Sequence, residues 1–171
     1  MRVLLASAVL AGGMLLAGGG AAVADTAGEA VVRAPTPPCR SSQLAAVSAA
    51  RTGAAQVRIT VVNDGSRACA LKGYPTVAVA GLGSPQRNKP LSVQRLGTAR
   101  TVVLPAGGTA STTVRFTPVL GEADGYCASG AEPTVAPSLV VGVAGGAFQL
   151  APDDGGEFAL CGTAARVTAF R

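Results

Sequence analysis

Few residues in this chain could carry out chemistry, and the most useful type is missing. The sequence contains no histidine, so neither a Ser-His-Asp nor a Cys-His arrangement can form, because both need an imidazole to accept the nucleophile's proton. A serine-lysine pair would have to use Lys72 or Lys89, and neither lies in an S-x-x-K sequence. These residue types therefore predict a protein that is not an enzyme.

Two groups of acidic residues could supply paired carboxylates or a cation site. One consists of Glu122 and Asp124, and the other of Asp153, Asp154 and Glu157. Acid-base catalysis needs a carboxyl group that is withdrawn from water, whereas these residues lie among glycines in predicted surface turns. The second group is a candidate calcium site. Copper and zinc are not expected, because the cysteines are expected to be oxidised and form no C-x-x-C pair. We expect no cofactor.

The N-terminus has the features of a cleaved export signal. Arg2 precedes an apolar run over residues 3–20, and residues 22–24 form a small-residue cleavage site of the A-x-A kind. We predict a signal peptide over residues 1–24 and a secreted chain that begins at Asp25. The alternative is a membrane anchor, but glycines lower the hydrophobicity of the run and no charged flank follows it. No stable membrane insertion is expected after cleavage.

The mature chain is expected to hold one domain. Residues 25–38 end in a proline-rich stretch that is typical of a flexible or PPII-like lead, which leaves residues 39–171 for a single folded unit. Loss of Arg2 lowers the formal net charge from +5 to +4, and the remaining basic residues are scattered. This distribution does not resemble the dense basic stripe of a nucleic-acid-binding protein. We expect a monomer with an unknown extracellular or cell-envelope partner.

Alternating apolar and polar residues predict β-strands. Val57, Ile59 and Val61 alternate with more polar residues over 56–63, and this strand ends at a turn over 63–65. Residues 109–117 alternate in the same way. Further strands are expected at 43–48, which would also suit a helical turn, and at 76–80, 91–95, 101–104, 138–143, 147–150 and 166–170. Seven or eight short strands among these nine ranges, together with a long loop at 121–137, imply an all-β, immunoglobulin-like antiparallel β-sandwich.

The four cysteines, Cys39, Cys69, Cys127 and Cys161, are an even number in an exported chain, which indicates two disulfides. Three pairings are possible. If the first strand runs antiparallel to 56–63, Cys39 lies near Cys69. We therefore favour Cys39 with Cys69, which leaves Cys127 with Cys161. Each bridge would add about 3 kcal/mol by loop closure, so a structural role accounts for all four residues.

Three short motifs stand out between residues 63 and 110. They are Asn63-x-Gly65, Cys69-x-Leu71-x-Gly73-Tyr74-Pro75 and Leu104-Pro105-Ala106-Gly107-Gly108-x-Ala110, with Cys127 and Cys161 following later. On these residues the chain resembles a family of exported actinobacterial proteins known only as a domain of unknown function (number 4232), over about residues 39–170. The resemblance implies a β-sandwich and no activity, because the family brings no assigned catalytic residues. Many members look like lipoproteins, whereas this sequence has no cysteine at the cleavage point.

Because the residue types predict neither catalysis nor a cofactor, the leading functional hypothesis is an extracellular or cell-envelope binding module. The loops at 81–90 and 121–137 are long enough to recognise a partner. Tyr74 and Tyr126 are the aromatic candidates, although for Tyr74 we favour a structural role, with its ring stacked beside Pro75 over the Cys69 bridge. The alternative is a secreted protease inhibitor that uses residues 127–133, stiffened by a disulfide. A hydrolase using surface carboxylates is the third possibility.

Overall fold

The computed structural model describes residues 34–121 and 125–171. The predicted signal peptide, residues 25–33 of the predicted lead and the carboxylate pair Glu122 and Asp124 lie outside the described residues. Within this range the two strands with the clearest alternation are neighbours. Strand β2 (Gln56–Asn63) pairs antiparallel with β8 (Thr109–Thr117), and both have the bounds that the alternation predicts.

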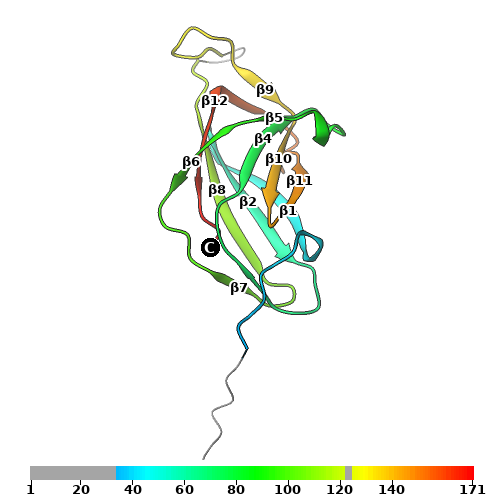
Figure 1. Cartoon of the computed structure of the whole chain (residues 1–171). Coiled ribbons are helices and arrows are strands. Elements are labelled where there is room, and N and C mark those ends of the chain that lie inside the picture. The colour runs from blue at the N-terminus through cyan, green and yellow to red at the C-terminus, as the bar shows by residue number, and fades with distance from the viewer. Residues whose placement is uncertain (1–33, 122–124) are drawn as a thin grey trace, which may run out of the picture. The chain divides into compact units, whose positions relative to one another are not determined.

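The larger sheet forms around β2 and β8 (Figure 1). Its order is β1-β2-β8-β12-β6, and β9 pairs with the first part of β12. The added strands are β1 (Leu44–Gly53), β12 (Phe158–Thr168), β6 (Ser92–Leu96) and β9 (Thr134–Ala136). Strand β12 therefore has different neighbours along its length, because it leaves β9 and continues between β8 and β6.

A second sheet of four strands has the order β11-β10-β4-β5. Its members are β11 (Gly146–Leu150), β10 (Ser138–Val143), β4 (Thr76–Ala80) and β5 (Lys89–Pro90). Strands β10 and β11 form a tight hairpin whose two turn residues, Ala144 and Gly145, have φ values of 49° and 80°. Positive φ at both positions matches the twist of the hairpin that they connect.

The remaining elements are short. Strand β3 (Cys69–Leu71) pairs with β7 (Val102–Leu104), and two three-residue 3-10 turns, η1 (Ser41–Gln43) and η2 (Pro85–Arg87), precede β1 and β5. Across residues 34–121 and 125–171, no helix is long and apolar enough to cross a membrane.

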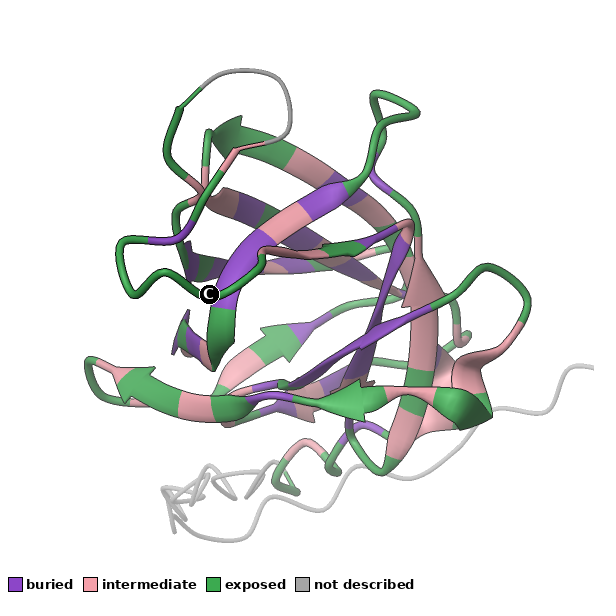
Figure 2. Ribbon diagram, turned by 90° about the horizontal axis from the view of Figure 1, so that it is seen from above, coloured by how far each residue is buried: buried purple, intermediate pink, exposed green. Residues whose placement is uncertain are grey.

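The core lies between the two sheets, and Figure 2 marks the buried residues on the strands of both sheets. The larger sheet contributes its alternating apolar residues from β2, β8 and β12, and the smaller sheet contributes those of β10 and β4. The set consists of Val57, Ile59, Val61, Ala110, Val114, Phe116, Ala165 and Val167 on one side, and Leu139, Val141, Val143, Val77 and Val79 on the other. Burying these side chains is the main favourable term in folding.

The predicted all-β sandwich with two disulfides is confirmed, and so are the pairings Cys39–Cys69 and Cys127–Cys161. The described residues form twelve strands, more than the predicted seven or eight. The excess comes mostly from strands of two or three residues, which are too short to show a period of two. One pairing departs from the antiparallel pattern, because β6 runs parallel to β12.

The proline-rich lead joins the fold before its predicted end. The carbonyl of Pro37 accepts a hydrogen bond from the N–H of Ala70 at 2.7 Å, and Pro38 forms an isolated parallel bridge with Ala70. Proline has no N–H to donate, but its carbonyl can still accept from an edge strand. Residues 37–38 therefore continue the β3–β7 pair before Cys39 enters its disulfide.

Candidate functional site

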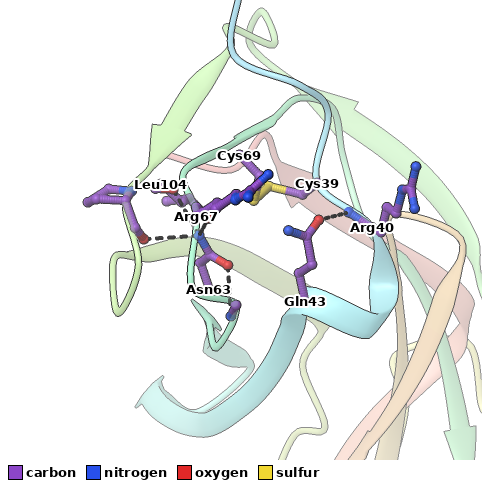
Figure 3. The surroundings of a disulfide bond; sticks show 9 residues. Cys39, Arg40, Gln43, Asn63, Arg67, Cys69 and Leu104 are labelled. Atoms are coloured by element: carbon purple, nitrogen blue, oxygen red, sulfur yellow. Dashed lines mark hydrogen bonds between the residues drawn. A yellow bond between two sulfur atoms is a disulfide. The ribbon is translucent and has the colours of Figure 1, made fainter.

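Asn63 lies at the end of β2 (Figure 3), and its polar side chain is fully buried, with an exposed fraction of 0%. Its Nδ2 donates to the carbonyl oxygens of Arg67 at 2.8 Å, Leu104 at 3.0 Å and Pro105 at 3.1 Å. Its Oδ1 accepts from the N–H of Gly65 at 3.1 Å. A buried amide is tolerated only when it is bonded in this way. One side chain therefore joins the turn after β2 to the turn before β8.

The turn before β8 is shaped to receive the backbone of Asn63. The N–H of Asn63 donates to the carbonyl of Gly108 at 2.8 Å, and the N–H of Gly107 donates to the carbonyl of Asn63 at 2.8 Å. Gly107 has a φ of 72°, and a Cβ on Gly108 would lie 2.6 Å from Cδ of Pro105. Glycine is required at both positions, by backbone conformation at the first and by space at the second.

The Cys39–Cys69 disulfide lies beside this cluster, as Figure 3 shows. Cys69 begins β3 and pairs in register with Leu104 of β7, whose carbonyl accepts from Asn63. Leu71 and Leu104 are both buried in the core. The first and third sequence motifs and the cysteine half of the second thus meet at one end of the sandwich.

Tyr74 has a structural position at the entry to β4. Its hydroxyl donates to the carbonyl of Gly97, and the guanidinium of Arg95 lies 5.5 Å from its ring centroid. Pro75 is fully buried beside it, and Gly73 has a φ of 116°. These contacts connect the start of β4 to the loop that follows β6. Tyr74 is half-buried and does not form a free aromatic platform.

The long loop after β8 lies at the other end of that strand (Figure 1), and two of its apolar side chains, Leu120 and Tyr126, are exposed. Leu120 and Tyr126 form an antiparallel bridge, with backbone hydrogen bonds of 2.9 Å and 2.8 Å in the two directions. Residues that face each other in such a bridge project their side chains to the same side. Leu120 is 39% exposed and Tyr126 is 59% exposed. We call these two residues the loop patch.

The second disulfide anchors the loop patch to the larger sheet. Cys127 follows Tyr126 directly and is bonded to Cys161 of β12, which is the register partner of Thr117 at the end of β8. Cys127 and Cys161 are both buried. The chain segments on both sides of the loop patch are therefore fixed to neighbouring strands, which limits the conformational entropy that binding a partner would cost.

A family model described as a domain of unknown function (DUF4232) matches residues 39–171. The chain belongs to this family. The DUF4232 match begins at Cys39 and includes both disulfides, the three motifs and the loop patch. A search among curated proteins finds no match.

Most of the motif residues of this DUF4232 domain have structural roles. Asn63, Gly107 and Gly108 hold two turns together, and Leu71 and Leu104 fill the core. The motifs lie near the N-terminal end of β8, whereas the loop patch follows the C-terminal end of the same strand. The candidate functional surface is therefore the part of the domain that the motifs do not occupy.

Two carboxylates of the acidic turn after β11 form hydrogen bonds and an ion pair with residues of β1. The Asp153 carboxylate accepts from Ser48 Oγ at 2.7 Å and from the N–H of Ala49 at 2.8 Å. Asp154 forms an ion pair with Arg51 at 3.2 Å, and Arg51 also donates to the carbonyl of Glu157. Among the described residues, no group of three or more acidic, cysteine or histidine side chains could hold a metal ion. Of the three predicted calcium residues, Asp153 therefore bonds to a hydroxyl and an amide group, Asp154 pairs with a guanidinium group, and Glu157 accepts a hydrogen bond through its backbone carbonyl.

Sequence reasoning singled out Tyr126 but missed its partner Leu120. The signal that could have found it is Leu120 itself, an apolar residue just before Gly121 in a segment between two turn residues, where polar residues are usual. The other predicted recognition loop, residues 81–90, contains η2 and exposes Leu82 at 65%. It has no disulfide to fix it, so we give the loop patch precedence.

Proposed function

We propose that this chain is a secreted, non-catalytic binding domain that recognises an extracellular or cell-envelope protein through the loop patch. The observation that carries the proposal is the exposure of Tyr126 and Leu120 side by side on a loop fixed by Cys127–Cys161. Tyrosine is enriched among the residues that dominate binding energy at protein interfaces. Two disulfides support export, because such bonds persist in oxidising compartments.

The first prediction concerns Tyr126. Replacing Tyr126 by serine is expected to weaken partner binding at least about tenfold, because an exposed aromatic anchor would be lost while the loop stays bonded. The measurement uses the exported, disulfide-bonded protein with a photo-crosslinking amino acid at position 126. Envelope and culture-medium fractions of the producing cells are irradiated, and the crosslinked protein is identified by mass spectrometry. The affinity of that purified protein for the wild type and for Tyr126→Ser is then compared.

Val103 supplies the matched control. It is exposed at 53% on β7, near the motif end of the domain, and a serine there also removes exposed apolar surface. We expect no crosslink from position 103 and unchanged affinity for Val103→Ser. Equal crosslinking at both positions, or equal loss of affinity in both variants, would contradict the proposal. If the captured partner is a protease that the domain inhibits, the exposed residues 128–132 beside Cys127 would make the inhibitor alternative the specific function.

The second prediction concerns catalysis. The purified protein is expected to hydrolyse a panel of ester, glycan and peptide substrates no faster than buffer does. The chain has no histidine, the four cysteines are bonded in disulfides, and Asp153 and Asp154 are engaged with β1. Asp153→Asn and Asp154→Asn variants serve as controls for trace contamination. Activity in the wild type that disappears in either variant would show that the domain is an enzyme.

A further inference from the structure

A notch of about 340 Å³ opens on the outer face of the larger sheet, between β8 and β12. It exists because the ladder between these strands is interrupted. Cys161 pairs with Thr117, but the next register pair is Ala165 with Phe116, so that three residues of β12 have no opposing residue on β8. Gly162, the first of the three, has a φ of 73°. This bulge separates the strands, and the notch is lined by Pro118, which is exposed, Ala164, which is half-buried, and the buried residues Phe116 and Ala165.

Two arginines border the notch and face each other across the strands. Arg115 of β8 and Arg166 of β12 are register partners, and both side chains are exposed on the outer face. Like charges directly opposite each other destabilise a sheet, so this arginine pair lowers the stability of the folded domain. Among the described residues, the one ion pair joins Arg51 to Asp154, so no carboxylate lies within 4.0 Å of the Arg115 or Arg166 guanidinium.

Neutral amides extend the arginine pair into a row. Gln56 is the register partner of Arg115 on β2, and Gln94 is the partner of Arg166 on β6. Oε1 of Gln94 accepts from Nε of Arg166 at 3.3 Å. This bond helps to orient the Arg166 side chain and leaves its terminal N–H groups available, since a guanidinium has five donors. The structure shows no hydrogen bond from the Arg115 side chain to another described residue, so its donors are available as well.

We propose that the notch binds an oxyanion, either a carboxylate or a phosphoryl group, carried on an apolar stem. The oxyanion would accept hydrogen bonds from Arg115 and Arg166 together, which offsets their mutual repulsion. The apolar stem would lie in the notch against Pro118 and Ala164, the apolar lining residues that are not buried, and a bare inorganic ion would leave this space unfilled. This site is separate from the loop patch, and it gives the domain a small-ligand specificity beyond the proposed protein recognition.

The test is a titration of the ¹⁵N-labelled, disulfide-bonded protein followed by amide chemical shifts. The probes are benzoate for the carboxylate source, phenyl phosphate for the phosphoryl source, inorganic phosphate for the oxyanion alone, and neutral benzamide for the stem alone. We expect saturable shifts at residues 115, 116, 165 and 166 with benzoate or phenyl phosphate, and the tighter of the two identifies the source. Binding is expected to weaken at least about tenfold in Arg115→Gln and in Arg166→Gln.

Arg58 provides the matched control, because it is exposed on the outer face of β2 but does not border the notch. Arg58→Gln is expected to bind like the wild type, and so is Tyr126→Ser, which separates failure of the notch from failure of the loop patch. Unchanged shifts in the rest of each spectrum verify folding. The proposal is overturned if neither organic anion saturates, if Arg58→Gln loses as much affinity, or if benzamide or inorganic phosphate binds as tightly as the organic anions.

Discussion

Replacing Asn63 by leucine is expected to lower the free energy of unfolding by about 3–5 kcal/mol, because the substitution leaves several buried polar groups without partners. The carbonyl oxygens of Arg67, Leu104 and Pro105 would lose their donor, and the N–H of Gly65 would lose its acceptor. Leucine is branched at Cγ as asparagine is and is not smaller, so a cavity does not explain the loss. The measurement is urea unfolding with the disulfides intact, followed by circular dichroism, since the chain contains no tryptophan.

Two further substitutions separate hydrogen bonding from packing. Asn63→Asp keeps the shape of the side chain but replaces its donor by a carboxylate oxygen that faces three carbonyl oxygens. If the amide only fills space, this variant is nearly as stable as the wild type. If its hydrogen bonds matter, the loss is at least as large as in the leucine variant. Ser66→Ala, in the same turn but exposed, is expected to change stability by no more than about 0.5 kcal/mol.

The role of Asn63 shows how far the sequence could lead. The sequence assigns Asn63 to a turn with Asp64 and Gly65, which is correct for its backbone position. Its burial follows from the same alternation that predicts β2, because Asn63 continues the series of Val57, Ile59 and Val61 on the inward face. The acceptors of its amide could not be predicted, because two of them are about forty residues away, in a turn before β8.

Strand bounds were predictable where buried and less buried residues alternate, as in β2 and β8, and where a short apolar run is bounded by turn residues, as in β4 and β10. The observed bounds of β2, β4, β8 and β10 equal the predicted ranges, whereas β12 begins eight residues earlier than the predicted 166–170 strand. Its first part pairs with β9, and the bulge at 162–164 interrupts the alternation between the two parts. A local pattern carries no information about such a change of neighbours.

The candidate surfaces depend on pairings between distant segments, and this is why the sequence showed them only in part. Arg115 was predicted to lie on the polar face of its strand, but its position opposite Arg166 requires the register of β8 with β12. Leu120 and Tyr126 become one surface only because the loop closes in a bridge. The disulfide pairing was predictable, because it followed from one antiparallel neighbour relation, between β1 and β2.

The two disulfides are expected to stabilise the domain by similar amounts but to differ in what depends on them. They join residues separated by 30 and 34 positions in the sequence, so loop closure predicts that the Cys39→Ser/Cys69→Ser variant and the Cys127→Ser/Cys161→Ser variant each lose about 3.5 kcal/mol. Only the Cys127→Ser/Cys161→Ser variant is expected to bind the partner more weakly through the loop patch while it is still folded, because Cys127 adjoins Tyr126. Urea unfolding and the affinity measurement check the two expectations separately.

Combining each disulfide variant with Asn63→Ala tests whether the two ends of β8 are energetically independent. Asn63 and the Cys39–Cys69 bridge share the turn from β2 to β3, in which the carbonyl of Arg67 accepts from Asn63. Their effects on unfolding free energy are expected to deviate from additivity by more than about 0.5 kcal/mol, whereas Asn63→Ala and loss of Cys127–Cys161 are expected to add within that limit. If the effects add for both combinations, the shared turn does not couple Asn63 to the Cys39–Cys69 bridge. Coupling in both would mean that β8 transmits the disturbance between the motif end and the loop patch.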